Sequence, residues 1–410
     1  MTQKIEEICR LFAFPGTQID QERRFDIEQK LAFEFGIKCL SSGISLLSTQ
    51  NCFSENVFSI LTTWIEGKPD LWTRSIGHLN RAVSSENREH VIAAIVVLAI
   101  SASESGVEGS WRFESPQPIF FRVGDLVLFS IRSGRIDSKL GDFRAEFDGD
   151  GTTIHISKSN QGKVEITSKG EKNGYIHSPR IDACAQRINI VPSVLASPAL
   201  LIMDSGPKSF FEDKLVNFNV KGQLTLTFRH LLSLNSEIHH WVLSVVREII
   251  PIKSIKGSVG SSSCTWDCGA IALTVSDLES PLLLLEMLVH EASHQHFFLA
   301  KLLGNMDDGT DTREYLSPMM GMNRPIEKIL LAYHAVINML SLYCNISEQK
   351  SGTSDEFLEK RIQILLEKSN HLRPLISQTN SLTPIGKALW LSLREKESLL
   401  LSVFHISKKI

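Results

Sequence analysis

The sequence has no long hydrophobic run, no cluster of cysteines and no excess of charge of either sign. Its 410 residues carry 43 Lys and Arg against 46 Asp and Glu, for a formal net charge of −3. A near-neutral balance argues against nucleic acid as the main partner, because phosphate binding needs excess basic side chains on one face. The most apolar runs, Val91–Ile100 and Pro281–Val289, are shorter than the ~20 residues needed to cross a bilayer. We therefore expect no nucleic-acid partner and no membrane span.

The cysteines and the N-terminus indicate the compartment. Seven cysteines, an odd number spread along the chain, suit free thiols in a reducing cytosol better than a disulfide framework. Cys264 and Cys268 are separated by three residues, which is not the spacing of a zinc knuckle. Glu6 and Glu7 precede only a short apolar stretch, unlike a signal peptide. We expect a soluble, cytoplasmic protein, and nothing in the sequence sets its oligomeric state.

The predicted fold class is α+β and mainly helical, because composition changes at about residues 107 and 227. The predicted domains are an N-terminal helical region at 1–107, a β-rich segment at 108–227 that is a candidate for substrate binding, and a mainly helical metal-binding domain at 228–410. In the first region, apolar residues recur at helical spacing. The expected helices there are Ile19–Phe35, Asn56–Trp64 and Glu89–Ala102.

Short runs of β-branched and aromatic residues, separated by turn signals, predict strands in the middle segment. These runs are Ile119–Val123, Leu126–Ile131, Phe143–Phe147, Thr152–Ile156, Lys163–Thr167 and, ending the segment, Leu224–Leu226. The stretch Asp148–Gly151 resembles a calcium loop but lacks its flanking helices and final glutamate, so we expect a hairpin turn. Farther on, Leu231–Ile250 predicts one long segment and Gly269–Val275 a short strand.

The clearest chemical signal is His290-Glu291-Ala292-Ser293-His294, the H-E-x-x-H pattern. On a helix His290 and His294 lie one turn apart, so both imidazoles leave the same face and form half of a transition-metal site. Apolar neighbours such as Met287 turn that face inward. A capped helix with two core histidines is the alternative. His296 lies off the stripe and is expected at the surface or behind a ligand.

The ends and the carboxylates of this helix add detail. Ser276 with Glu279 forms a possible capping box, and Pro281 suits the first turn. Glu291 points about a quarter-turn from the histidines. In a zinc peptidase it would be the general base, whereas in an iron oxygenase it would orient a ligand or a water. Glu286, one turn before the first histidine, is a weaker candidate for that orienting role.

Two imidazoles do not make a tight site, so a third ligand is needed. Glu314 lies twenty residues past His294, the spacing of thermolysin-like zinc peptidases, but Asp307-Asp308-Gly309 before it is a loop signal. His334 lies at the margin of the apolar face of a helix predicted to begin at Pro325, and would face a neighbouring helix. We expect His334 to be the third ligand, with Glu314 as the alternative.

The order of these motifs resembles a known family. A strand GAIALTVSD is followed by EMLVHEASHQHFF, then REYLSP, then Arg324-Pro325, then His334-Ala335. Over about Cys264–Tyr343 this resembles the HExxH-type 2-oxoglutarate-dependent peptide β-hydroxylases, which occur with ribosomal-peptide modification systems. The chain departs from that family at Met319–Asn323, where a more polar and aromatic stretch is expected, and this departure concerns the substrate more than the metal.

The resemblance implies an Fe(II) held by His290, His294 and His334, with O2 and 2-oxoglutarate as cosubstrates. The enzyme would hydroxylate a C–H bond, at the β-carbon of a residue in a ribosomally made precursor peptide. The runner-up is a zinc metallopeptidase with Glu314 as third ligand and Glu291 as base. A third interpretation is a binding or scaffold protein with a vestigial site.

The resemblance also places 2-oxoglutarate. This cosubstrate chelates iron through its keto-acid end, and its far carboxylate needs a cation. Arg324 is the expected partner, because arginine offers a bidentate fork and stays charged when buried. Arg313 is the fallback. Tyr315 and Ser317 are expected to add hydroxyl donors.

Overall fold

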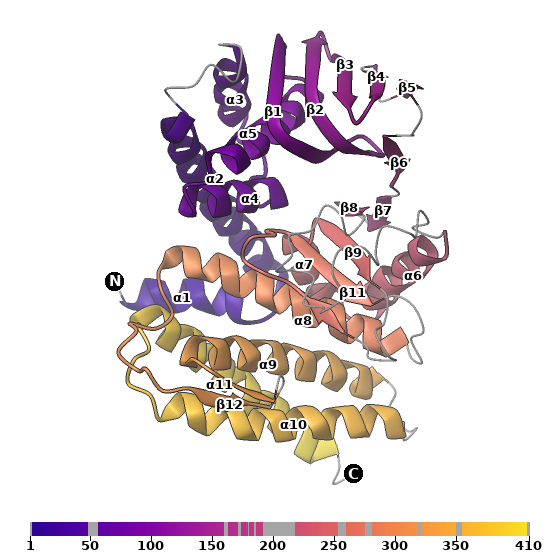
Figure 1. Ribbon diagram of the computed structural model, residues 1–410. Helices are drawn as coiled ribbons and strands as arrows, with labels where there is room; N and C mark the ends of the chain where they lie inside the picture. Colours follow the sequence, from indigo (N-terminus) through magenta and orange to yellow (C-terminus); the bar gives the residue numbers. More distant parts are fainter. Residues whose placement is uncertain are drawn as a thin grey trace.

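The computed structural model describes residues 2–47, 56–159, 163–170, 174–178, 180–183, 186–191, 218–252, 260–274, 281–318, 321–349 and 355–407. Helices at the N-terminus, a β-rich middle and C-terminal helices follow one another along the sequence (Figure 1). The fold is α+β and mainly helical, which confirms the predicted fold class.

The described helices are α1 (Thr2–Ala13), α2 (Gln18–Leu47), α3 (Asn56–Glu66), α4 (Arg74–Ser84), α5 (Arg88–Glu104), α6 (Phe218–Leu234), α7 (Ser236–Val245), α8 (Pro281–Ala300), α9 (Ile326–Gln349), α10 (Glu356–Ser377) and α11 (Pro384–Ser407). The described strands are β1 (Gly109–Val123), β2 (Leu126–Lys139), β3 (Asp142–Gly149), β4 (Thr152–Lys158), β5 (Val164–Lys169), β6 (Tyr175–His177), β7 (Arg180–Ala183), β8 (Gln186–Ile190), β9 (Glu248–Ile252), β10 (Ser261–Ser262), β11 (Ala270–Thr274), β12 (Tyr315–Ser317) and β13 (Met322–Arg324).

The upper half in Figure 1 is an antiparallel meander covered by helices. Strands β1 to β5 pair in sequence order, and β6 pairs with β2. Along β3 buried and exposed residues alternate, so one face of the sheet meets α5 and the other faces solvent. Asp150 and Gly151 have φ of +47° and +78° and join β3 to β4 in a two-residue hairpin, which confirms the predicted turn.

A second sheet, in the order β10-β11-β9-β8-β7, lies between the meander and the C-terminal helices. Its central strands β11, β9 and β8 run parallel, and the outer strands β10 and β7 run antiparallel to their neighbours. All five residues of β11 are buried, as expected for a parallel strand covered on both faces. Helix α8 contacts β10 and β11, so this sheet positions the H-E-x-x-H helix.

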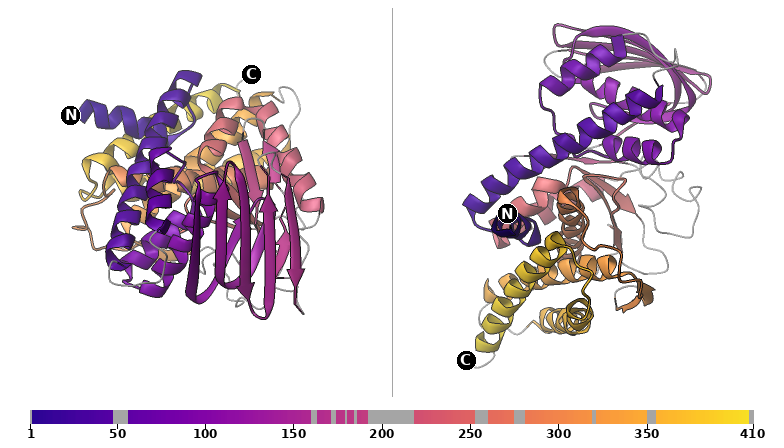
Figure 2. Two further views of the ribbon diagram at one scale, coloured as in Figure 1. Left: turned by 90° about the horizontal axis from the view of Figure 1, so that it is seen from above. Right: turned by 90° about the vertical axis from the view of Figure 1, so that its left-hand side faces the viewer.

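Helix α2 joins the two halves. Ala32 belongs to the core of the C-terminal half, whereas Leu40 and Leu47 belong to the core under the meander. Figure 2 shows this long helix running from near the N-terminus up to the meander. Helix α1 contacts α11 and α8. The hydrophobic cores thus run across the boundaries at about 107 and 227, which remain predictions.

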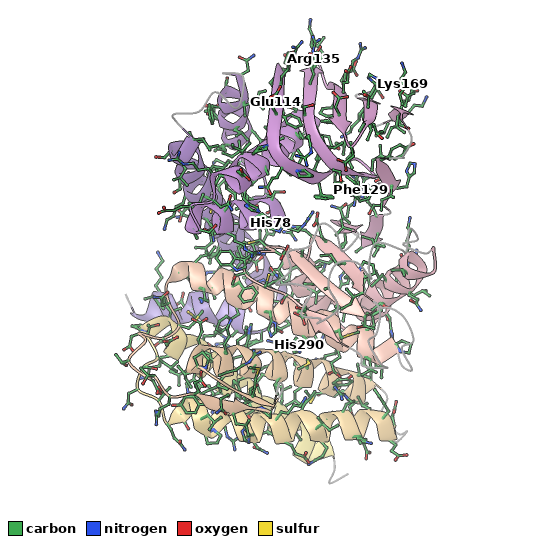
Figure 3. All side chains as sticks on the ribbon, viewed as in Figure 1. His78, Glu114, Phe129, Arg135, Lys169 and His290 are labelled. Carbon is green, nitrogen blue, oxygen red and sulfur yellow. The ribbon has the colours of Figure 1, made fainter. Side chains whose placement is uncertain are left out.

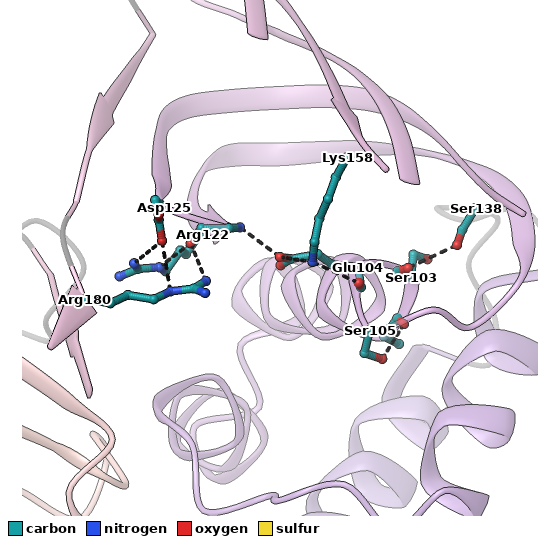
Figure 4. A network of polar contacts seen from close by, with 10 residues as sticks. Ser103, Glu104, Ser105, Arg122, Asp125, Ser138, Lys158 and Arg180 are labelled. Atoms are coloured by element: carbon teal, nitrogen blue, oxygen red, sulfur yellow. Dashed lines mark hydrogen bonds and ion pairs between the residues drawn. The ribbon is translucent and has the colours of Figure 1, made fainter. Parts of the chain in front are cut away.

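Charged residues also connect the meander to its surroundings (Figure 4). Lys158 on β4 pairs with Glu104 at the end of α5, with 3.0 Å between Nζ and Oε1. The Arg122 guanidinium donates to the carbonyl of Ser178 at 2.9 Å. Arg180 on β7 pairs with Asp125 at 3.0 Å. These contacts fix β4 on α5 and bring the start of the second sheet beside β1.

Two of the sequence expectations are wrong. Leu224–Leu226, expected as a strand, lies inside α6, where Leu224, Phe228 and Leu231 are buried at helical spacing. Leu231–Ile250 is not one segment, because α6 ends at Leu234 and the Asn235 side chain caps the start of α7. Helices α1 and α4 lie in the predicted N-terminal helical region but are not among the helices named there.

Within the described residues, α9 alone is long and apolar enough to cross a membrane. Its most apolar window is 89% buried inside the protein. The helix is therefore a core element of the fold, packed between α8, α10 and α11.

Candidate metal centre

Helix α8 carries the H-E-x-x-H residues through the middle of the C-terminal half. It begins at Pro281, as expected, whereas the proposed capping residues Ser276 and Glu279 lie outside the described residues. The helix contacts α1, α7, α9 and the second sheet, which explains why most of its residues are buried. Only a few of its residues, His290 and His294 among them, keep partial access to solvent, and Figure 3 labels His290 on this helix.

The structure brings His290, Glu291 and His294 together. One potential ligand atom from each lies within 4.8 Å of the others, and no other such group occurs in the described part of the protein. The imidazole centroids are 4.5 Å apart. One Glu291 oxygen is 3.3 Å from His294 Nδ1 and the other is 3.8 Å from His290 Nε2. Small side-chain movements would bring these atoms to coordination distances.

The carboxylate of Glu291 is buried, which is a favourable position for binding a cation. It is 1% exposed, and neither carboxylate oxygen accepts a hydrogen bond of normal geometry within the described residues. Its polar neighbours are the two imidazoles and Ser261, and a metal ion shared with the imidazoles would compensate its buried charge. The residues present therefore fit a divalent transition metal.

The charge states of the cluster suit coordination. Burial lowers the pKa of His290 to about 4, although the Glu291 carboxylate opposes this effect. The ring is therefore neutral near pH 7, as a metal ligand must be. Burial alone would raise the pKa of Glu291, but the two imidazoles outweigh it and lower the pKa to about 2. The site thus offers a neutral imidazole at His290 beside an ionised carboxylate at Glu291.

Glu286, one turn before His290, does not touch the cluster. Tyr343 on α9 donates to its carboxylate at 2.6 Å, and Arg361 on α10 donates to it through Nε at 3.0 Å. A second guanidinium nitrogen of Arg361 also contacts Glu286. Glu286 thus ties α9 and α10 to the helix of the histidines, and its predicted role in orienting a ligand stays a prediction.

His334 lies away from the pair. It is fully buried, and its Nε2 contacts the carbonyl oxygens of Ala13 at 2.8 Å and Phe12 at 3.1 Å. Its ring also contacts Trp241 and Phe297, with centroids 6.2 and 6.1 Å away. The structure therefore places this predicted ligand among α1, α7 and Phe297 of α8, where it holds the end of α1.

The other predicted residues also lie outside the cluster. Tyr315 and Arg324 face each other in the short β12–β13 ladder. The Tyr315 hydroxyl donates to Asp311 at 2.6 Å, and Ser317 is buried beneath the ladder. Glu314 is exposed just before β12 and does not join the histidines.

Two further expectations can be located. Arg313, the fallback cation, is exposed and holds Asp311 through two nitrogens at 2.8 Å. His296 is not at the surface, because it is fully buried. Its Nδ1 is 3.1 Å from Glu28 of α2 and its Nε2 donates to the carbonyl of Trp241 at 2.9 Å. It therefore ties α8 to α2 and α7, behind the metal cluster.

Sequence reasoning missed Tyr343, Arg361 and Lys368. Arg361 and Lys368 are seven residues apart, so they share one face of α10. This spacing can be recognised in the sequence. That the two residues face α8, however, depends on tertiary packing and could not be predicted. No protein-family model and no curated protein matches this sequence.

Proposed function

We propose that the protein is a metal-dependent enzyme, and specifically a non-haem Fe(II) oxygenase that uses 2-oxoglutarate and O2. The observation that carries the proposal is the group formed by His290, Glu291 and His294. Two imidazoles and one carboxylate close together, with other coordination positions left for substrates, are the ligand set typical of such oxygenases. In this proposal Glu291 takes the place of the third ligand that the sequence assigned to His334.

The iron, when bound, would supply the oxidising chemistry that protein residues lack. The protein's own residues would do the rest. His290 and His294 would hold the metal as neutral imidazoles, and Glu291 would balance its charge. The cations on α10 would attract an anionic cosubstrate. The substrate we propose is a peptide, hydroxylated at a C–H bond of one of its residues in keeping with the family resemblance, and the compartment is the cytoplasm.

The second candidate is a zinc metallopeptidase. It is favoured by the position of Glu291 beside both histidines, because the glutamate of H-E-x-x-H is the general base in such enzymes. It is disfavoured by Glu314, its expected third ligand, which is exposed and separate from the histidines.

The test is anaerobic reconstitution with Fe(II) and 2-oxoglutarate, followed by absorption spectroscopy of the iron–keto-acid charge-transfer band. We expect the band, and no proteolysis. Glu291→Gln should weaken Fe(II) binding, because it removes a charged ligand but keeps the shape, whereas Glu314→Gln should change nothing. Tight zinc with peptide hydrolysis and no band would overturn the oxygenase. Zinc retained in Glu291→Gln and lost in Glu314→Gln would establish the peptidase.

A further inference from the structure

The contacts among helices α8, α9 and α10 show which of their residues lie at the same height along the helix axes. Lys301, just after α8, pairs with Glu327 at the start of α9 at 2.7 Å. At the other end Tyr343 of α9 contacts Glu286 of α8. Helices α8 and α9 are therefore antiparallel and in register over this length (Figure 1).

Helix α10 runs in the same direction as α8. Tyr343 and Arg361 both meet Glu286, so these residues share one level. Farther along, Tyr333 of α9 and Arg373 of α10 both face Glu397. Since α9 therefore runs antiparallel to both of its neighbours, α8 and α10 advance together from the level of Glu286.

This register places Lys368 at the level of the metal cluster along the helix axes. Lys368 is seven residues past Arg361, or about 10 Å along the axis. His290 and His294 are four and eight residues past Glu286, or about 6 and 12 Å. Lys368 thus lies between the levels of the two histidines, and it interacts electrostatically with His290 and Glu286.

The two cationic side chains of α10 differ in whether an anion pairs with them. Arg361 is occupied by Glu286. Lys368 is half-buried, and no ion pair or side-chain hydrogen bond engages its ammonium within the residues that the structure describes. Burial lowers its pKa. A half-buried ammonium at the level of a metal site is suited to an anionic ligand.

Arg324 is less well placed for this task. It stands two residues before α9, whose first turn is level with Lys301 and thus about 10 Å beyond the level of His294.

We propose that Lys368 binds a carboxylate of the metal's organic co-ligand, the far carboxylate of a keto diacid such as 2-oxoglutarate. The inference rests on the proposed oxygenase function, and it replaces Arg324 with Lys368 as the group that selects a diacid. The ion pair between Arg361 and Glu286 would hold α10 at the distance this contact needs.

The test compares Lys368→Met and Lys368→Arg with Lys360→Met, a matched control on the exposed side of α10. The probes are 2-oxoglutarate and pyruvate, a keto acid that lacks the far carboxylate, titrated anaerobically into the Fe(II) protein. We expect Lys368→Met to raise the Kd for 2-oxoglutarate about tenfold or more, because a charge-assisted hydrogen bond is lost. The Kd for pyruvate and for Fe(II) should not change. Lys368→Arg should retain the preference for the diacid, and Lys360→Met should match the parent.

The outcomes are separable. A parent protein that forms the band, together with an unchanged Kd for 2-oxoglutarate in Lys368→Met, would overturn this inference alone. No band in the parent would overturn the proposed function and this inference with it. An equal loss of affinity for pyruvate would also overturn the inference, because Lys368 would then act on the metal end.

Discussion

Replacing His334 by alanine separates the arrangement of this structure from the ligand set that the family resemblance implies. In the structure His334 is buried and bonds the last carbonyls of α1, from the opposite end of the sequence. Asn338, one turn later, also donates to the carbonyl of Ala13, at 3.0 Å. These two residues hold the end of α1, and neither belongs to the metal cluster.

The cost of the change follows from these contacts. Losing a buried hydrogen bond costs about 1–3 kcal/mol, and the void left by the ring adds about 2 kcal/mol, since Trp241 and Phe297 lose a neighbour. Asn338 still satisfies the carbonyl of Ala13, which reduces the loss. We expect His334→Ala to lower the free energy of unfolding by about 3 kcal/mol in total.

Two measurements on the same samples show whether His334 stabilises the fold or binds the metal. Urea unfolding of metal-free protein should show the destabilisation, and metal content after anaerobic loading should show that Fe(II) binding is retained. His90→Ala, which removes an exposed histidine at the start of α5, is the control and should change neither. Loss of Fe(II) with unchanged stability would refute the account, because His334 would then be a ligand.

Two other predictions follow. Acid should destabilise the fold: burial lowers the pKa of His334 to about 3 and of His239 to about 4. In the unfolded chain both rings bind protons below pH ~6.5. The free energy of unfolding should therefore be highest above that pH and fall by up to several kcal/mol toward pH 4. A free energy of unfolding that does not change with pH over this range would contradict the prediction. Glu286→Gln should weaken the α8–α10 contact and destabilise the protein by about 1–2 kcal/mol in urea unfolding. Unchanged stability there would mean that Arg361 does not tie α10 to α8.

Local features of the fold could be predicted from the sequence. The β3–β4 hairpin followed from Asp150-Gly151, because few residues other than glycine, asparagine and aspartate adopt positive φ in succession. The H-E-x-x-H helix followed from its apolar spacing and from Pro281. The pairing of His290 with His294 followed from the pitch of the helix alone.

Contacts between distant segments could not be predicted. Apolar spacing showed that His334 faces a neighbour, but several helices fit that description. The structure packs His334 against Phe297 of α8, the neighbour that the sequence predicted, but its ring nitrogen meets the carbonyls at the end of α1, which the sequence could not indicate. The prediction of a strand at Leu224–Leu226 was wrong for a related reason. Three alternating residues fit a strand, and only the longer spacing to Leu231 indicates a helix.

The most direct measurement of the central claim is the metal content of the protein after anaerobic loading with Fe(II) and removal of unbound ion. The parent protein should carry one iron, and the variants His290→Ala and His294→Ala should each lose nearly all of it while they stay folded by circular dichroism. A parent protein without stoichiometric metal, or iron retained after both histidines are replaced, would contradict the account.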